Sequence, residues 1–115
     1  SPSVVDAVLT IPGLRGLVLE TFGAGNAPTD DWFLNSLKRA IERGVLIYNV
    51  SQCDGGRVTQ GRYQTSKVLQ QLGVVSGADI TVEAAITKLM FLLANEPDPT
   101  RLRQRLTDPI CGEMS

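Results

Sequence analysis

Residues 45–50 read VLIYNV, a run of apolar and β-branched side chains that predicts the clearest strand of the chain. A second run, RGLVLET at residues 15–21, places Leu17, Val18 and Leu19 side by side without polar alternation. Continuous apolarity is typical of parallel strands that are buried on both faces of a sheet. We therefore expect two central parallel strands, at about residues 16–20 and 45–50.

Helical spacing of apolar residues surrounds these strands. We predict helices at residues 3–10, 30–43, 63–72, 82–94 and 99–107, and a short strand at 74–75. Thr29 and Thr81 are expected to cap the helices that follow them. Strands that alternate with helices over short connections indicate a small three-layer α/β domain, flavodoxin- or Rossmann-like, whose parallel sheet is covered on both faces.

For two of these helices the sequence also predicts which residues face the core and which face solvent. In the helix at 82–94, we expect Ile86 and Met90 to face inward together with the other apolar residues. In the last helix, Arg101, Arg103 and Arg105 are expected to form a solvated face opposite Leu102 and Leu106.

Length and composition favour a single domain, residues 1–115, with one apolar core. The net charge of −1 and the aromatic content of 5% argue against a nucleic-acid partner. No run of 18 apolar residues is present, so no membrane-spanning helix is expected. The chain begins at Ser1 without a methionine, and we expect a processed or excised start.

The sequence contains no histidine, which excludes Ser–His, Cys–His and histidine–metal sites within this chain. Its two cysteines, Cys53 and Cys111, lie far apart and form no CxxC pair. A secreted domain more often carries a denser set of disulfides, so a reducing, cytoplasmic location is expected. Neither a metal nor another cofactor is expected.

Two polar, glycine-rich loops follow the two strands, at residues 21–28 and 51–63. Such loops gather at the carboxyl ends of parallel strands, where ligands bind. Asn26 is interpreted as a turn former or a ligand-binding residue, Cys53 as a packed thiol or a site residue, and Tyr63 as core or site. The incomplete glycine pattern argues against a dinucleotide fingerprint, and helix-terminus electrostatics account for Asp30 and Asp31.

Four segments in the same order resemble the C-terminal domain of cytosolic, type I L-asparaginases. They read ETFGAGNAP (20–28), RGVLIYNVSQCDGGRV (43–58), GVVSGADITVEAAITKLMFLL (73–93) and CGEMS (111–115), the last where the family usually shows RGE and a hydrophobic residue. The resemblance covers nearly the whole chain. It implies the C-terminal domain of the asparaginase fold.

The resemblance also implies a function. The family hydrolyses L-asparagine to L-aspartate and ammonia with a threonine nucleophile in an N-terminal domain, whose motifs are absent here, so no catalytic residue is expected in this chain. Each C-terminal domain of the family's homo-oligomer reaches into the active site of a dimer partner. Asn26 matches the asparagine that helps hold the substrate's charged α-groups, and Tyr63 falls where the family has a pocket-lining tyrosine.

Some bacterial members of the family also bind asparagine as an allosteric effector. Cys53 matches the cysteine of that effector site, and Ser51 stands where the family has a small hydroxyl residue. Glu20, however, occupies the position of the effector-binding arginine, and a carboxylate repels the carboxylate of the effector. We therefore expect allosteric activation to be weak or absent.

Three other functions remain open from the sequence. The chain could come from the asparaginase-like subunit of a tRNA-dependent amidotransferase, which has the same fold and passes ammonia onward. It could instead be a non-catalytic module that binds an amino acid, or a structural dimerisation domain. The sequence upstream of Ser1 would separate these alternatives.

Overall fold

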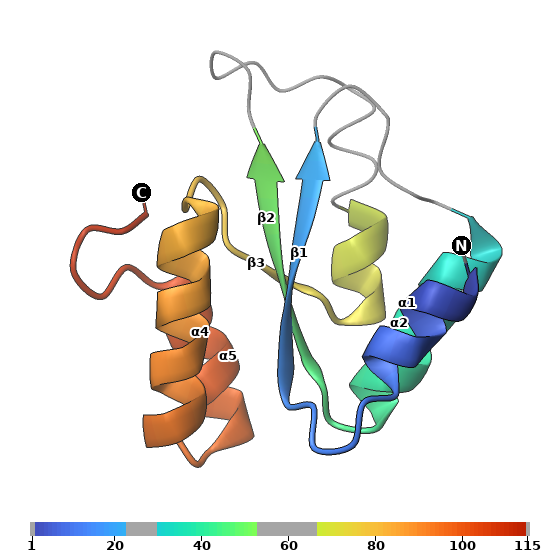
Figure 1. Ribbon diagram of the computed structural model, residues 1–115. Coiled ribbons are helices and arrows are strands. Elements are labelled where there is room, and N and C mark those ends of the chain that lie inside the picture. The colour runs from blue at the N-terminus through green and yellow to red at the C-terminus, as the bar shows by residue number, and fades with distance from the viewer. Residues whose placement is uncertain (1, 23–29, 53–66, 115) are drawn as a thin grey trace.

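The computed structural model describes residues 2–22, 30–52 and 67–114 (Figure 1). Three parallel strands form its sheet in the order β1-β2-β3: β1 (Gly16–Phe22), β2 (Leu46–Gln52) and β3 (Val75–Ser76). β1 and β2 pair over their full length, from Gly16 opposite Leu46 to Phe22 opposite Gln52. The predicted parallel pairing of the two apolar runs is therefore confirmed.

Helices cover both faces of this sheet (Figure 1). One face carries α1 (Pro2–Leu9), α2 (Asp31–Glu42) and the helical residues 67–72, and the other carries α4 (Val82–Asn95) and α5 (Pro99–Thr107). Connections between neighbouring parallel strands are right-handed as a rule, and the strand order advances in one direction. This rule accounts for α2 and residues 67–72 lying on the same side of the sheet. The predicted three-layer α/β architecture is confirmed.

Alternate residues of β2 supply the two halves of the core. Leu46, Tyr48 and Val50 belong to the apolar cluster on the α4–α5 side, whereas Ile47 belongs to the cluster on the α1–α2 side. Ile47 and Tyr48 are both fully buried, which is why this strand shows no polar alternation. Burying each large apolar side chain contributes roughly 1.5–3 kcal/mol, so the central strand stabilises both layers.

The observed N-caps of the helices match the predicted ones only in part. Thr81 caps α4 as predicted, because its hydroxyl oxygen accepts a hydrogen bond from the Ala84 N–H at 3.2 Å. The N-cap of α2 is Asp30 rather than Thr29, which lies outside the described residues. The Asp30 side chain makes no capping hydrogen bond. Its carbonyl accepts the N–H of Phe33 and Leu34, so the helix begins one residue later than predicted.

The inward face of α4 also differs from the prediction. Ile86 and Met90 are 45% and 67% exposed, whereas Ala85 and Leu89 are buried. Between these buried residues lies Lys88, whose side chain is only 4% exposed. The helix is therefore rotated so that a lysine, rather than Ile86 and Met90, lies in its buried stripe.

The arginines of α5 do not form a simple solvated face. Arg105 lies 3.2 Å from the buried carboxylate of Glu96, and the more exposed Arg101 lies 3.5 Å from the same oxygen. Arg103 donates to the carbonyl of Gly73, which links α5 to the turn before β3. Leu106 is fully buried on the opposite side, as expected. No helix in the described part of the chain is long and apolar enough to cross a membrane.

Candidate functional site

The carboxyl edge of the sheet is where the two polar loops begin. In the ladder, Thr21 lies opposite Ser51 and Phe22 opposite Gln52, so β1 and β2 end at the same level (Figure 1). The segments that follow, from residues 23 and 53 onward, therefore leave the sheet from neighbouring positions. The predicted convergence of the two loop origins at one edge is confirmed, as parallel strands require.

The predicted site residues themselves are only partly described. Asn26, Cys53 and Tyr63 lie outside the described residues, so their roles stay predictions. Ser51 lies in β2 next to Thr21, but its side chain is not described. Glu20 is exposed in β1, opposite Val50.

A buried polar pair at this edge was not predicted. The Thr21 hydroxyl donates to Asn49 Oδ1 at 3.2 Å, and the two residues are only 6% and 5% exposed. The Asn49 carbonyl also accepts the N–H of Gly77, in the turn after β3, at 2.8 Å. Asn49 thus contacts the ends of both neighbouring strands. The signal in the sequence is a single polar residue within the apolar run VLIYNV.

The turn after β3 is closely packed against this pair. A Cβ atom at Gly77 would lie 2.7 Å from Ile80 Cγ2 and 3.1 Å from the Asn49 carbonyl oxygen, so only glycine fits without a shift. The Ser76 hydroxyl accepts the N–H of Ala78 at 3.2 Å, and Ala78 adopts a φ of 55°. Three strand ends are therefore held together at the edge from which the two loops leave.

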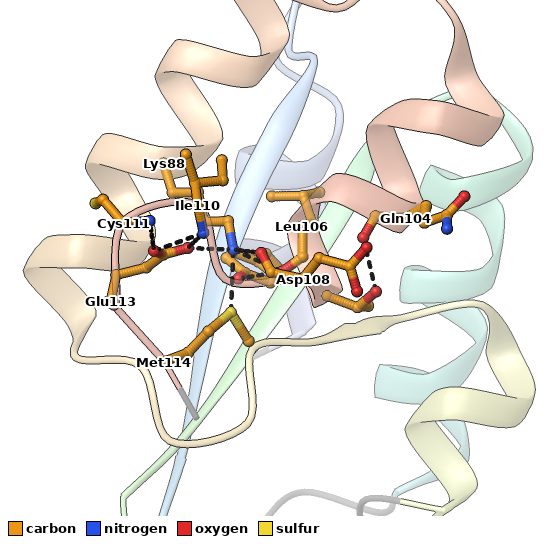
Figure 2. A network of polar contacts seen from close by, with 10 residues as sticks. Lys88, Gln104, Leu106, Asp108, Ile110, Cys111, Glu113 and Met114 are labelled. Atoms are coloured by element: carbon orange, nitrogen blue, oxygen red, sulfur yellow. Dashed lines mark hydrogen bonds and ion pairs between the residues drawn. The ribbon is translucent and has the colours of Figure 1, made fainter.

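A second polar network lies beside α4 (Figure 2). Lys88 Nζ lies 2.6 Å from Glu113 Oε2 and donates to the carbonyls of Leu106 and Asp108 at 3.2 and 2.7 Å. Glu113 Oε1 in turn accepts the N–H of Cys111 at 2.8 Å. This N–H and the Lys88 ammonium group hold the pKa of Glu113 well below its ordinary value. The network fixes the path of the C-terminal residues over α4.

A groove of about 470 Å³ lies between α4 and this C-terminal segment, lined by Phe91, Ile110 and the exposed free thiol of Cys111. The lining contains no histidine, because the chain has none, and the ammonium group of Lys88 is held by Glu113 and two carbonyls. Within residues 2–22, 30–52 and 67–114, no three His, Cys, Asp or Glu side chains gather as metal ligands.

Comparison with known proteins identifies a family. The sequence pattern of the Glutaminase/Asparaginase C-terminal domain matches residues 1–106. L-asparaginase 1 of Escherichia coli is 40% identical over 115 residues, which are 100% of this chain and 34% of that protein. One of the subunits of the glutamyl-tRNA(Gln) amidotransferase of Sulfolobus acidocaldarius is 36% identical over 115 residues, 100% of this chain and 25% of that protein.

A solved structure gives the same result. The crystal structure of L-asparaginase I from Vibrio cholerae superimposes with a TM-score of 0.84 at 38% sequence identity, over 100% of this chain and 34% of that chain. The chain therefore spans about a third of the length of the L-asparaginases that it matches.

Proposed function

This chain belongs to the glutaminase/asparaginase C-terminal domain family, and on that premise we propose that it is one domain of a longer L-asparaginase. The complete protein hydrolyses L-asparagine to L-aspartate and ammonia. The observation that carries the proposal is the match of the whole chain to a third of two L-asparaginases, in sequence and in structure. The colinear motifs from ETFGAGNAP to CGEMS agree with it.

In this proposal the nucleophile belongs to the N-terminal domain of the complete protein. Acyl transfer needs an activated hydroxyl or thiol and donors for the oxyanion. Two threonines of this chain already have structural roles that account for them. Thr21 donates to Asn49 inside the fold, and Thr81 caps α4.

The domain contributes substrate binding at the carboxyl edge of its sheet. Asn26 hydrogen-bonds the charged α-groups of asparagine, and Tyr63 lines the pocket. Support comes from the adjacent ends of β1 and β2, from which both loops begin.

Because the family acts as an oligomer, we further propose that this edge closes the active site of a neighbouring protomer in a cytoplasmic homodimer. The exposed free thiol of Cys111 agrees with a reducing compartment.

Allosteric activation by asparagine is weak or absent in this proposal. Ser51 and Cys53 correspond to effector-binding residues, but Glu20 brings an exposed carboxylate where the effector's own carboxylate needs a cation. A hyperbolic dependence of rate on asparagine concentration would support this interpretation. A strongly sigmoidal dependence that Cys53→Ala abolishes would contradict it.

A second function is favoured by one observation, the similarity of the whole chain to part of a glutamyl-tRNA(Gln) amidotransferase. The two functions differ in what ammonia release requires. We propose to measure ammonia release by the complete protein from free L-asparagine and L-glutamine, with and without glutamyl-tRNA and co-purifying protein. Turnover of free asparagine without tRNA supports the asparaginase. Turnover that requires charged tRNA and a second protein supports the amidotransferase.

A further inference from the structure

β1 forms one outer edge of the sheet. In the described part of the chain β2 is the only strand that pairs with it, along the whole length of β1. The Leu46 N–H donates to the Arg15 carbonyl at 2.9 Å, and in a parallel ladder the backbone groups of alternate residues point to the same side. Leu17 therefore points its N–H and carbonyl towards β2, whereas those of Val18 point away. A strand edge of this kind is a template for a further strand.

The side chains of β1 are less buried than those of β2. Leu17, Val18 and Leu19 are only partly buried, although Leu17 and Leu19 pack against one core cluster and Val18 against the other. Residues 47–49, which lie opposite them in β2, are all buried. A continuous apolar run is typical of a strand inside a parallel sheet. The sequence of β1 therefore fits an interior position better than an outer edge.

Helix α1, which precedes β1, is also incompletely buried. It packs beside α2, and the Ser36 hydroxyl donates to the Asp6 carboxylate at 2.8 Å between the two helices (Figure 1). Leu9 of α1 is buried in the core, whereas Val4 and Val8 are 61% and 39% exposed. Two consecutive elements, α1 and β1, thus leave apolar surface open to solvent.

The topology places a further strand at the outer edge of β1. A helical segment on the α1–α2 face precedes both β2 and β3, and the strand order advances in one direction. α1 precedes β1 on that same face. Crossover connections between parallel strands are right-handed in about 98% of cases. A parallel strand that is joined to β1 through α1 therefore lies on the side of β1 away from β2.

We propose that, in the complete protein, an apolar strand directly preceding α1 pairs in parallel with the outer edge of β1. The present chain makes up 34% of the two L-asparaginases that it matches, so the complete protein of the proposed function has chain to supply this strand. The added strand turns β1 into an interior strand and covers apolar surface of α1. A second copy of the chain, paired edge to edge through β1, would not explain why α1 occupies the place of a crossover helix. The inference concerns the fold and is independent of the proposed catalytic activity.

The test is amide hydrogen exchange of the complete protein, followed by residue-resolved mass spectrometry. The Val18 N–H reports on the outer edge of β1, and the Leu17 N–H, which points towards β2, is the matched control. We expect the two amides to exchange at rates within about 10-fold of each other, because both belong to a ladder. Proline breaks a ladder where it replaces a paired residue. A proline scan over the roughly 20 residues that precede Ser1 should therefore include substitutions that speed Val18 exchange about 100-fold while Leu17 stays protected.

Three results would overturn the inference. A Val18 amide that exchanges about 100-fold faster than Leu17 in the wild type shows an edge that is open to water. Slow Val18 exchange that no proline of the scan affects shows that something else covers the edge. Slow exchange that is lost on dilution identifies a second copy as the occupant. Where a proline speeds both amides, the sheet itself is lost, and alanine at the same position then decides by the same comparison.

Discussion

The Tyr48 hydroxyl donates to the Leu106 carbonyl at 2.6 Å, joining the central strand to α5 across 58 positions of sequence. Both residues are fully buried. Burial, with a smaller effect from the charge of Glu113, raises the pKa of Tyr48 to about 12. The phenol is therefore held as a neutral donor inside the α4–α5 layer.

Replacing Tyr48 by phenylalanine tests this contact. At neutral pH we expect Tyr48→Phe to lower the free energy of unfolding by roughly 0.5–1.5 kcal/mol, because one buried hydrogen bond is lost. The loss stays modest, since Lys88 Nζ still donates to the Leu106 carbonyl at 3.2 Å. Urea denaturation of the 115-residue chain measures it.

The same variant gives a prediction at alkaline pH. The folded-state pKa of about 12 lies above the unfolded value of about 10, so the contribution of Tyr48 to stability is complete below pH 10 and is lost as the pH rises toward 12. The wild-type chain should lose stability more steeply above pH 10 than Tyr48→Phe. Identical slopes in the two proteins would contradict the raised pKa.

The ion pair of Lys88 and Glu113 gives a prediction on stability. Lys88→Met removes the cation and leaves a nearly buried carboxylate without it, so we expect a clear drop in the denaturation midpoint. The double variant Lys88→Met/Glu113→Gln should recover part of the loss, because the uncompensated charge is gone. Thermal unfolding of the three proteins measures this. A Lys88→Met chain as stable as the wild type would show that the pair is not formed.

Glu113 also predicts a response to acid. Its folded-state pKa is lowered below the ordinary unfolded value of about 4.3, so its contribution is complete above that value and is lost as the pH falls through the folded pKa. Stability of the wild-type chain should fall below about pH 4, and Glu113→Gln should flatten that part of the profile. Denaturation at a series of acidic pH values provides the comparison.

The orientation of α4 is testable with two substitutions on one helix. Leu89 is 5% exposed and Met90 is 67% exposed. We expect Leu89→Ala to cost roughly 2–5 kcal/mol, because it removes buried apolar volume. Met90→Lys should change stability by no more than about 0.5 kcal/mol. A loss of stability in Met90→Lys as large as that in Leu89→Ala would favour the inward face that the sequence predicts, because that face contains both residues.

How much the sequence could predict depended on whether the relevant contacts were local. The runs around Val18 and Ile47 predicted two parallel strands, because burial on both faces leaves a continuous apolar pattern. Thr81 was predicted as a cap because capping acts within one turn. The buried face of α4 was predicted only in part: Ala85 and Leu89 are buried as expected, but Ile86 and Met90 are not. Apolar residues occupy most positions of VEAAITKLMFLL, so their spacing selects no single face.

Contacts between distant residues explain the remaining differences. Lys88 is buried because Glu113, 25 positions later, supplies its counter-charge. The Thr21–Asn49 bond depends on the register between two strands, which no local pattern fixes. In the candidate site, the common origin of the two loops followed from strand direction, whereas the roles of Asn26 and Tyr63 came from family resemblance and stay predictions.

Asn26 can be tested against a matched residue. In the complete protein, Asn26→Ala should raise KM for L-asparagine and lower kcat/KM by the equivalent of roughly 1–3 kcal/mol, because a hydrogen bond to a charged group is lost. Asn35→Ala, at an exposed position of α2, should leave the kinetics unchanged. Steady-state ammonia release measures both. Unchanged kinetics in Asn26→Ala would remove this residue from the substrate site.

We propose that the N-terminal domain carries the nucleophile and that this domain contributes substrate binding. The most direct test is ammonia release from L-asparagine, measured for the complete protein and for the 115-residue chain alone. We expect turnover by the complete protein and none by the isolated chain, because the nucleophile lies in the other domain and this chain has no histidine to act as a base. Adding the separately expressed N-terminal domain should restore some activity if the interface re-forms. Turnover by the isolated chain that survives further purification and is lost when one of its own threonines is replaced would contradict this division.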